Sequence, residues 1–149
     1  MTRYAATITS RRPAADTFSY LATFSNTADW DPGVVSAEQL DPGPVGSGTR
    51  FRLAVPFLGR RMALTYQVVK LVPGSEVILA AEGHLLRATD RILVAADGAG
   101  ATVSYEADVR LRGPLRLFDA LLRPGFRAVG ERAAAGLARA LAAPPVPQP

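Results

Sequence analysis

The chain has 149 residues, 48% of them hydrophobic, which is enough for one domain with a real core and too few for two. It contains no cysteine, which excludes disulfide bonds and thiolate chemistry, and no apolar run near the roughly 20 residues that cross a bilayer. The net charge of +4 comes from 17 basic residues, nearly all arginine, which are scattered along the sequence rather than gathered in a nucleic-acid-binding stripe. The first ten residues lack the apolar core of a secretory signal. These features predict a cytoplasmic protein with no nucleic-acid partner and no membrane span.

The first 33 residues predict one strand and two short helices. Residues 4–10 alternate and are rich in residues typical of strands. Pro13 suits the first turn of a helix over residues 14–22, because its missing N–H is not needed there. A second short helix, capped by Ser25 or Asn26, should run through Trp30 and end at the turn formed by Asp31-Pro32-Gly33.

Six further strands are predicted after this turn. In each, apolar residues alternate with polar or small ones, most clearly in the last, where Val103, Tyr105 and Ala107 share one face. Strands of this kind form an antiparallel sheet that is covered on one face only. The predicted strands span residues 34–40, 49–56, 61–71, 76–82, 87–96 and 101–111.

The last predicted element is a long amphipathic helix over residues 114–142. Its apolar residues recur at steps of three and four and should cover the sheet: Leu115, Phe118, Leu122, Phe126, Val129, Ala133, Leu137 and Leu141. Pro124 should kink this helix or begin its longer second half. Gly125, Gly130 and Gly136 each cost about 1 kcal/mol relative to alanine inside a helix, and close approach to the sheet or room for a ligand would explain them.

The predicted architecture is an α+β domain over residues 1–142, in which a seven-stranded curved antiparallel sheet wraps around the long C-terminal helix. Two short helices lie between the first and second strands. Residues 143–149 are rich in proline, cannot continue the helix, and are expected to form a frayed tail.

This order of elements resembles the helix-grip fold of the START-like, or SRPBCC, superfamily, to which the birch-pollen-allergen-like proteins belong. The resemblance is closest to its bacterial polyketide cyclase/dehydrase group. The segments that carry it are 28–34 (ADWDPGV), 46–50 (GSGTR), 90–92 (DRI), 100–105 (GATVSY) and 113–115 (GPL). It implies a hydrophobic cavity between sheet and helix, and neither a metal nor a cofactor. The group has no catalytic motif that maps onto this sequence.

The residues expected to line this cavity come from the apolar faces of the strands and of the last helix, with Trp30 closing one end. They are Trp30, Phe51, Leu53, Met62, Leu64, Tyr66, Tyr105, Phe118, Leu122 and Phe126.

Catalytic candidates are few. His84 is the only histidine and follows Gly83 in a hairpin turn, where an exposed residue is expected. If Asp90 points into the cavity, loss of water would raise its pKa and let it act as a general base. The favoured interpretation is instead an outer-face carboxylate paired with Arg87 or Arg91, because charged groups are seldom buried unpaired. One histidine without cysteine or clustered carboxylates gives no metal site.

The sequence therefore favours a protein that binds a small hydrophobic molecule, such as a lipid, a polyketide or an aromatic metabolite. The alternative is a cyclase or dehydratase that draws its acids and bases from Asp90, Tyr66, Tyr105 and His84, which requires at least two of these groups in one pocket. A third alternative, suggested by similar small bacterial proteins, is a regulatory or toxin–antitoxin role. Homodimerisation through an outer strand is left open.

Overall fold

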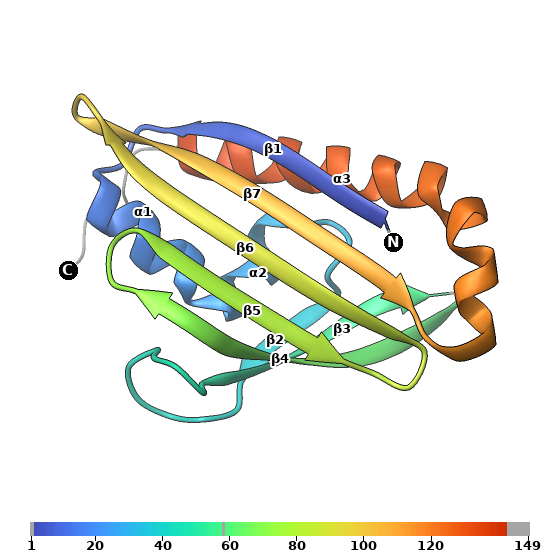
Figure 1. The fold of residues 1–149 in the computed structure, drawn as a ribbon. Helices are drawn as coiled ribbons and strands as arrows, with labels where there is room; N and C mark the ends of the chain where they lie inside the picture. Colours follow the sequence, from blue (N-terminus) through green and yellow to red (C-terminus); the bar gives the residue numbers. More distant parts are fainter. Residues whose placement is uncertain (1, 58, 143–149) are drawn as a thin grey trace.

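The largest element of the molecule is a curved antiparallel sheet of seven strands (Figure 1). The computed structural model describes residues 2–57 and 59–142, without the side chains of Asp119 and Leu122. The strand order is β1-β7-β6-β5-β4-β3-β2. The strands are β1 (Thr2–Ser10), β2 (Ser36–Gln39), β3 (Arg50–Phe57), β4 (Arg60–Val72), β5 (Glu76–Glu82), β6 (Leu86–Asp97) and β7 (Gly100–Leu111).

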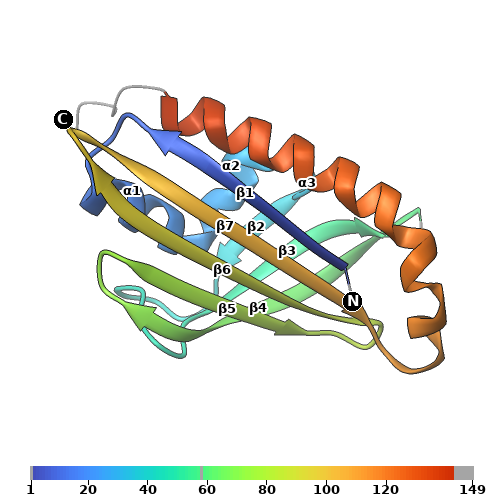
Figure 2. The ribbon, with the colours of Figure 1, turned by 45° about the horizontal axis from the view of Figure 1, so that its top comes forward.

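The long helix α3 (Asp119–Ala142) runs along β1 and contacts α2 (Figure 2). The predicted α+β architecture and the position of this helix are thereby confirmed. The expected tail, 143–149, lies outside the described residues. No helix in the described part of the chain is long and apolar enough to cross a membrane.

Three short helical segments connect β1 to β2: α1 (Ala14–Ala22), the 3-10 turn η1 (Phe24–Asn26) and α2 (Thr27–Trp30). The predicted cap is absent, since the Asn26 side chain donates to the Tyr20 carbonyl at 3.0 Å and makes no cap hydrogen bond to α2. Thr27 instead donates its hydroxyl to the Phe24 carbonyl at 2.7 Å. Because this hydroxyl donates to a carbonyl, it does not accept from a backbone N–H, and α2 has no side-chain cap.

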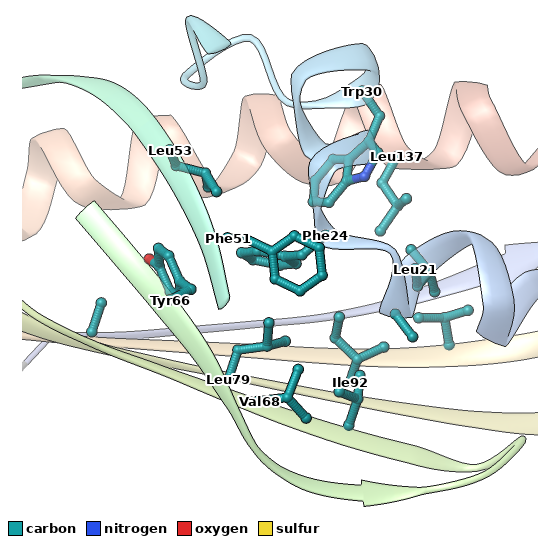
Figure 3. Close-up of a cluster of buried hydrophobic side chains, with 14 of the residues drawn as sticks. Leu21, Phe24, Trp30, Phe51, Leu53, Tyr66, Val68, Leu79, Ile92 and Leu137 are labelled. Carbon is teal, nitrogen blue, oxygen red and sulfur yellow. The ribbon is translucent and has the colours of Figure 1, made fainter. Parts of the chain in front are cut away.

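The tightly packed core lies under α1 and the C-terminal half of α3 (Figure 3). Leu21 and Phe24 meet Leu137 of α3 and the inward residues of the central strands, such as Leu79 and Ile92. These five side chains are at most 2% exposed. Burial of each large apolar side chain contributes about 1.5–3 kcal/mol, so this end of the molecule holds helix and sheet together.

The start of the last helix differs from the prediction. Residues Gly113–Phe118 form the 3-10 segment η2 and the α-helix begins only at Asp119. Because a 3-10 segment has three residues per turn, the predicted stripe does not continue through it. Phe118 is 51% exposed and Val129 42%, whereas Leu141 is fully buried. The first turns of α3, which include Pro124, bend away from the axis of the rest of the helix (Figure 1).

The three glycines of α3 have different surroundings. A Cβ at Gly136 would collide with the Trp30 carbonyl oxygen, and one at Gly130 would collide with the Tyr4 ring. A Cβ at Gly125 would meet nothing within 4 Å. Close approach to the sheet therefore occurs at Gly130, whereas Gly136 approaches α2 instead, and Gly125 borders the cavity described next.

Candidate functional site

A cavity of about 590 Å³ lies between the inner face of the sheet, α2 and α3, from Leu121 to Leu137. The fully buried apolar side chains of α3, Leu137 and Leu141, lie near its C-terminal end, so the helix packs most closely on the core there. The first turns of α3 bend away from the axis of the rest of the helix (Figure 2), and apolar side chains of its N-terminal half stay exposed, with Leu121 at 73% and Val129 at 42%. A volume of this size falls within the range of about 300–1,000 Å³ that is usual for small-molecule pockets.

Most of the residues expected to line this space do so: Trp30, Leu53, Met62, Leu64, Tyr66, Tyr105 and Phe126. Phe51 is not among the lining residues. It is fully buried beneath the cavity, where its ring meets that of Phe24 at a centroid distance of 6.2 Å. Phe118 was also placed wrongly, because η2 carries it out to the surface. The side chain of Leu122 lies outside the described residues.

Asp90 lines the cavity, which overturns the favoured interpretation of an outer-face carboxylate. On β6, Ala88, Asp90 and Ile92 occupy alternate positions and all three are buried. The two arginines proposed as its partners lie on the other face. Arg91 binds Glu76 at 2.7 Å, and Arg87 lies 3.5 Å from Glu82. The period-two pattern of β6 thus puts a carboxyl among apolar side chains.

Tyr105 holds Asp90 from the neighbouring strand. The residue paired with Ile92 across β6 and β7 is Tyr105, so its side chain lies diagonally opposite Asp90 on the same face. The Tyr105 hydroxyl donates a hydrogen bond to Asp90 Oδ2. Burial raises the pKa of Asp90 to about 7, while the hydrogen bond from Tyr105 lowers it and the charges of Asp31 and Asp108 raise it further. Near neutral pH this carboxyl can both accept and release a proton.

Tyr66 and Tyr105 present hydroxyl groups that stay protonated. Burial and the charge of Asp90 raise the pKa of both phenols well above 10. Their rings are held by aromatic neighbours, since Trp30 meets Tyr105 at 5.8 Å and Phe24 meets Tyr66 at 5.1 Å between centroids. The Tyr66 oxygen points away from the cluster of Phe24 and Phe51 (Figure 3). Such a hydroxyl can donate to a ligand carbonyl.

Asp31 is a second carboxyl of the site and was not identified from the sequence. It follows α2, lines the cavity, and accepts a hydrogen bond of 2.8 Å from the Gly33 N–H. Burial raises its pKa, and the Gly33 bond opposes this. The Asp-Pro-Gly turn was interpreted only as a helix stop. An aspartate two residues before a glycine whose N–H it binds is typical of such turns, and nothing in the pattern placed it facing the cavity.

The remaining catalytic candidate, His84, does not line this cavity, and neither does Asp108, whose charge acts on Asp90. His84 is exposed and borders a second hollow of about 430 Å³ beside the β5–β6 turn, together with Glu82 and Arg112. Asp108, on the outer face of β7, pairs with Arg3 at 2.8 Å. Among the described side chains, no three potential metal ligands of the His, Cys, Asp or Glu type gather in one place.

Comparison with known proteins adds a family and a set of similar folds. A family model described as polyketide cyclase / dehydrase and lipid transport matches residues 1–142. Among solved structures, a START superfamily protein from Mycobacterium smegmatis has a TM-score of 0.76 at 14% identity and covers 95% of this chain and 97% of its own. The Zhui aromatase/cyclase from Streptomyces sp. R1128 has a TM-score of 0.72 at 19% identity, with coverages of 93% and 90%.

A protein from Thermus thermophilus has a TM-score of 0.73 at 17% identity and covers 94% of this chain and 95% of its own. At these identities the likeness concerns the fold alone. No curated protein matches the sequence.

Proposed function

Because the chain belongs to the polyketide cyclase / dehydrase and lipid transport family, we propose that it binds a small hydrophobic molecule between the sheet and α3. The ligand is a lipid, a polyketide or an aromatic metabolite. The observation that carries this proposal is the open volume of about 590 Å³ between the sheet and the helix that covers it. That volume lies well inside the range of pockets that bury a drug-sized molecule.

The walls of the cavity support a mainly apolar ligand. Leu53, Met62 and Leu64 contribute from β3 and β4, and Phe126 covers them from α3. Transfer of apolar ligand surface from water to such walls contributes about 25 cal/mol per Å², which is the main driving force available here.

The polar groups of the cavity support a ligand with one hydrogen-bonding head. Asp90 on β6 and Tyr66 on β4 are buried, Tyr105 on β7 is partly buried, and most of the other lining residues are apolar. A ligand carbonyl or hydroxyl bound there would satisfy these groups and set the orientation of the molecule, since a few polar groups in an apolar pocket fix the pose.

The test is displacement of a fluorescent fatty-acid probe from the wild-type protein and from two variants. Ala107→Phe adds a phenyl group on β7 inside the cavity, where Ala107 lies opposite Asp90. We expect it to weaken probe binding about tenfold or more, because a filled pocket cannot bury the ligand. Ala95→Phe adds the same group at an exposed site of β6 and should leave affinity within about twofold. Equal affinities in the two variants, or no binding by the wild type, would refute the proposal.

A second candidate function is a cyclase or dehydratase reaction in the same cavity. It is favoured by one specific observation: three of the four polar candidates, Asp90, Tyr66 and Tyr105, line a single pocket. Asp90 as a carboxylate would take a proton from a carbon next to a ligand carbonyl, and the Tyr66 hydroxyl would hydrogen-bond the oxygen on which negative charge develops. Tyr105 would hold the carboxyl in place through its hydrogen bond.

This candidate makes its own prediction with a synthetic polyketone as substrate. The rate should rise with pH through about 7, the value to which burial raises the pKa of Asp90, because the base must be ionised. Asp90→Asn should abolish turnover and retain binding of the fatty-acid probe. Turnover that survives in Asp90→Asn, or a rate that does not change with pH, would exclude Asp90 as the base. No turnover by the wild type would leave ligand binding as the function.

A further inference from the structure

One end of the molecule carries apolar side chains on its surface. The β3–β4 and β5–β6 hairpins and the beginning of α3 all lie at this end (Figures 1 and 2). Leu117 is 80% exposed, Leu121 73% and Phe118 51%, and Leu85 of the β5–β6 turn is 38% exposed. The backbone joins the two parts of this surface, since Arg112 N–H donates to the Leu85 carbonyl at 2.8 Å. We call the surface formed by these four residues and by Arg60, Arg61, Arg112, Arg116 and Arg123 the tip surface.

The same end is rich in positive charge. Arg60 and Arg61 lie at the β3–β4 hairpin, Arg112 follows β7, and Arg116 and Arg123 flank the exposed leucines; all five are exposed. The exposed acid of the β5–β6 hairpin, Glu82, lies 3.5 Å from Arg87. In the sequence these arginines are far apart, and it is the fold that gathers them.

The tip surface adjoins the opening of the cavity. Pro56 at the end of β3 and Leu121 and Gly125 at the start of α3 are exposed residues that also line the cavity. Leu121 thus belongs both to the rim of the cavity and to the exposed apolar group.

We propose that the tip surface docks the protein on an anionic lipid bilayer, with the cavity opening beside the membrane. Leucine and phenylalanine side chains on a short helical segment enter the boundary between headgroups and acyl chains, and arginines around them bind lipid phosphates. The exposed apolar side chains match the acyl chains of an anionic bilayer in polarity, and the arginines at the same end match its phosphates in charge. The proposal goes beyond ligand binding in the cavity, because it names a surface and a partner that do not depend on an occupied cavity.

The test is co-sedimentation of the full chain with vesicles made of equal parts phosphatidylglycerol and phosphatidylcholine, and with vesicles of phosphatidylcholine alone. We expect binding to the anionic vesicles to be stronger by about tenfold or more, since each arginine near an anionic surface adds roughly fivefold. Raising the salt to about 1 M should weaken this binding, because charges are then screened beyond about 3 Å.

The double variant Leu117→Glu/Phe118→Glu should lose vesicle binding by about tenfold or more, because it removes the inserting side chains and adds two negative charges. The matched control is Val69→Glu/Val72→Glu, which changes two exposed valines, 55% and 41% exposed, in the part of β4 away from the β3–β4 hairpin. It should bind vesicles as the wild type does. Neither the Leu117/Phe118 pair nor the Val69/Val72 pair lines the cavity. Both double variants should therefore bind the fatty-acid probe with wild-type affinity and melt at the wild-type temperature.

Several results would overturn the proposal. One is equal binding to the two kinds of vesicle, or none to either. Another is equal loss in the two double variants. A third is a wild-type dimer in light scattering that Leu117→Glu/Phe118→Glu converts to monomers, which would make the tip surface an interface between two copies of the chain.

Discussion

Asp90→Asn should make the protein more stable than the wild type at pH 8, by up to about 4 kcal/mol, and equally stable near pH 4. Burial raises the pKa of the folded Asp90 to about 7, whereas the unfolded carboxyl titrates near 3.8. Between these values the folded state holds a proton that the unfolded state has released, so wild-type stability falls as the pH rises from about 4 to about 7. The difference between the folded and unfolded pKa values of Asp90 corresponds to about 4 kcal/mol of unfolding free energy. Asparagine carries no charge and still accepts the Tyr105 hydroxyl bond.

Urea unfolding of both proteins at several pH values measures this difference directly. Asp41→Asn is the control of opposite sign, because hydrogen bonds from Arg50 lower the pKa of Asp41. That variant should be less stable than the wild type at neutral pH, and the deficit should shrink in acid. A difference between Asp90→Asn and the wild type that does not change with pH would mean that Asp90 is not buried as described.

Gly136→Ala should destabilise the protein by about 2 kcal/mol or more, although alanine favours a helix over glycine by about 1 kcal/mol. The new Cβ would collide with the Trp30 carbonyl oxygen, and a backbone atom cannot rotate away as a side chain can. Either α3 or α2 must move, and Trp30 contacts Tyr105 at the cavity wall. The loss should appear as a fall in melting temperature of about 5 °C or more.

Gly125→Ala is the matched control within the same helix. A Cβ there meets nothing within 4 Å, so the helix preference of alanine should act alone and raise stability by up to about 1 kcal/mol. If the two alanine variants had the same stability, α3 would not rest on the Trp30 backbone, and the described position of the helix would be wrong.

The sheet could be predicted because the alternation of apolar and polar residues can be seen within each strand's own sequence. In β7, Val103, Tyr105 and Ala107 alternate with polar residues, and a one-residue slip would turn all of them to solvent. The same pattern explains why cavity residues on β3 and β4, such as Leu53 and Leu64, could be identified.

For Asp90, the alternation of β6 and the rule that charged groups are seldom buried unpaired led to opposite predictions. The period of β6 places it between Ala88 and Ile92 on the inner face. The outer-face prediction instead assumed that the carboxylate is charged and pairs with Arg87 or Arg91. Because burial raises its pKa to about 7, the carboxyl can instead lose its charge and remain inside.

Other features depend on contacts between distant segments. Phe118 continues an apolar stripe in the sequence, but η2 interrupts the helical period and leaves it on the surface. Arg60 and Arg116 are 56 residues apart in the numbering and share one end of the molecule through the fold. Cavity volume is likewise a property of packing, which no residue pattern specifies.

The central claim is that a hydrophobic molecule binds between the sheet and α3. A crystal structure of the protein grown with the fatty-acid probe tests it most directly. We expect the acyl chain to lie against Leu53, Leu64 and Phe126, with its head near Asp90 and Tyr105. A probe bound only on the outer surface, with the cavity closed by the side chains around it, would contradict the account.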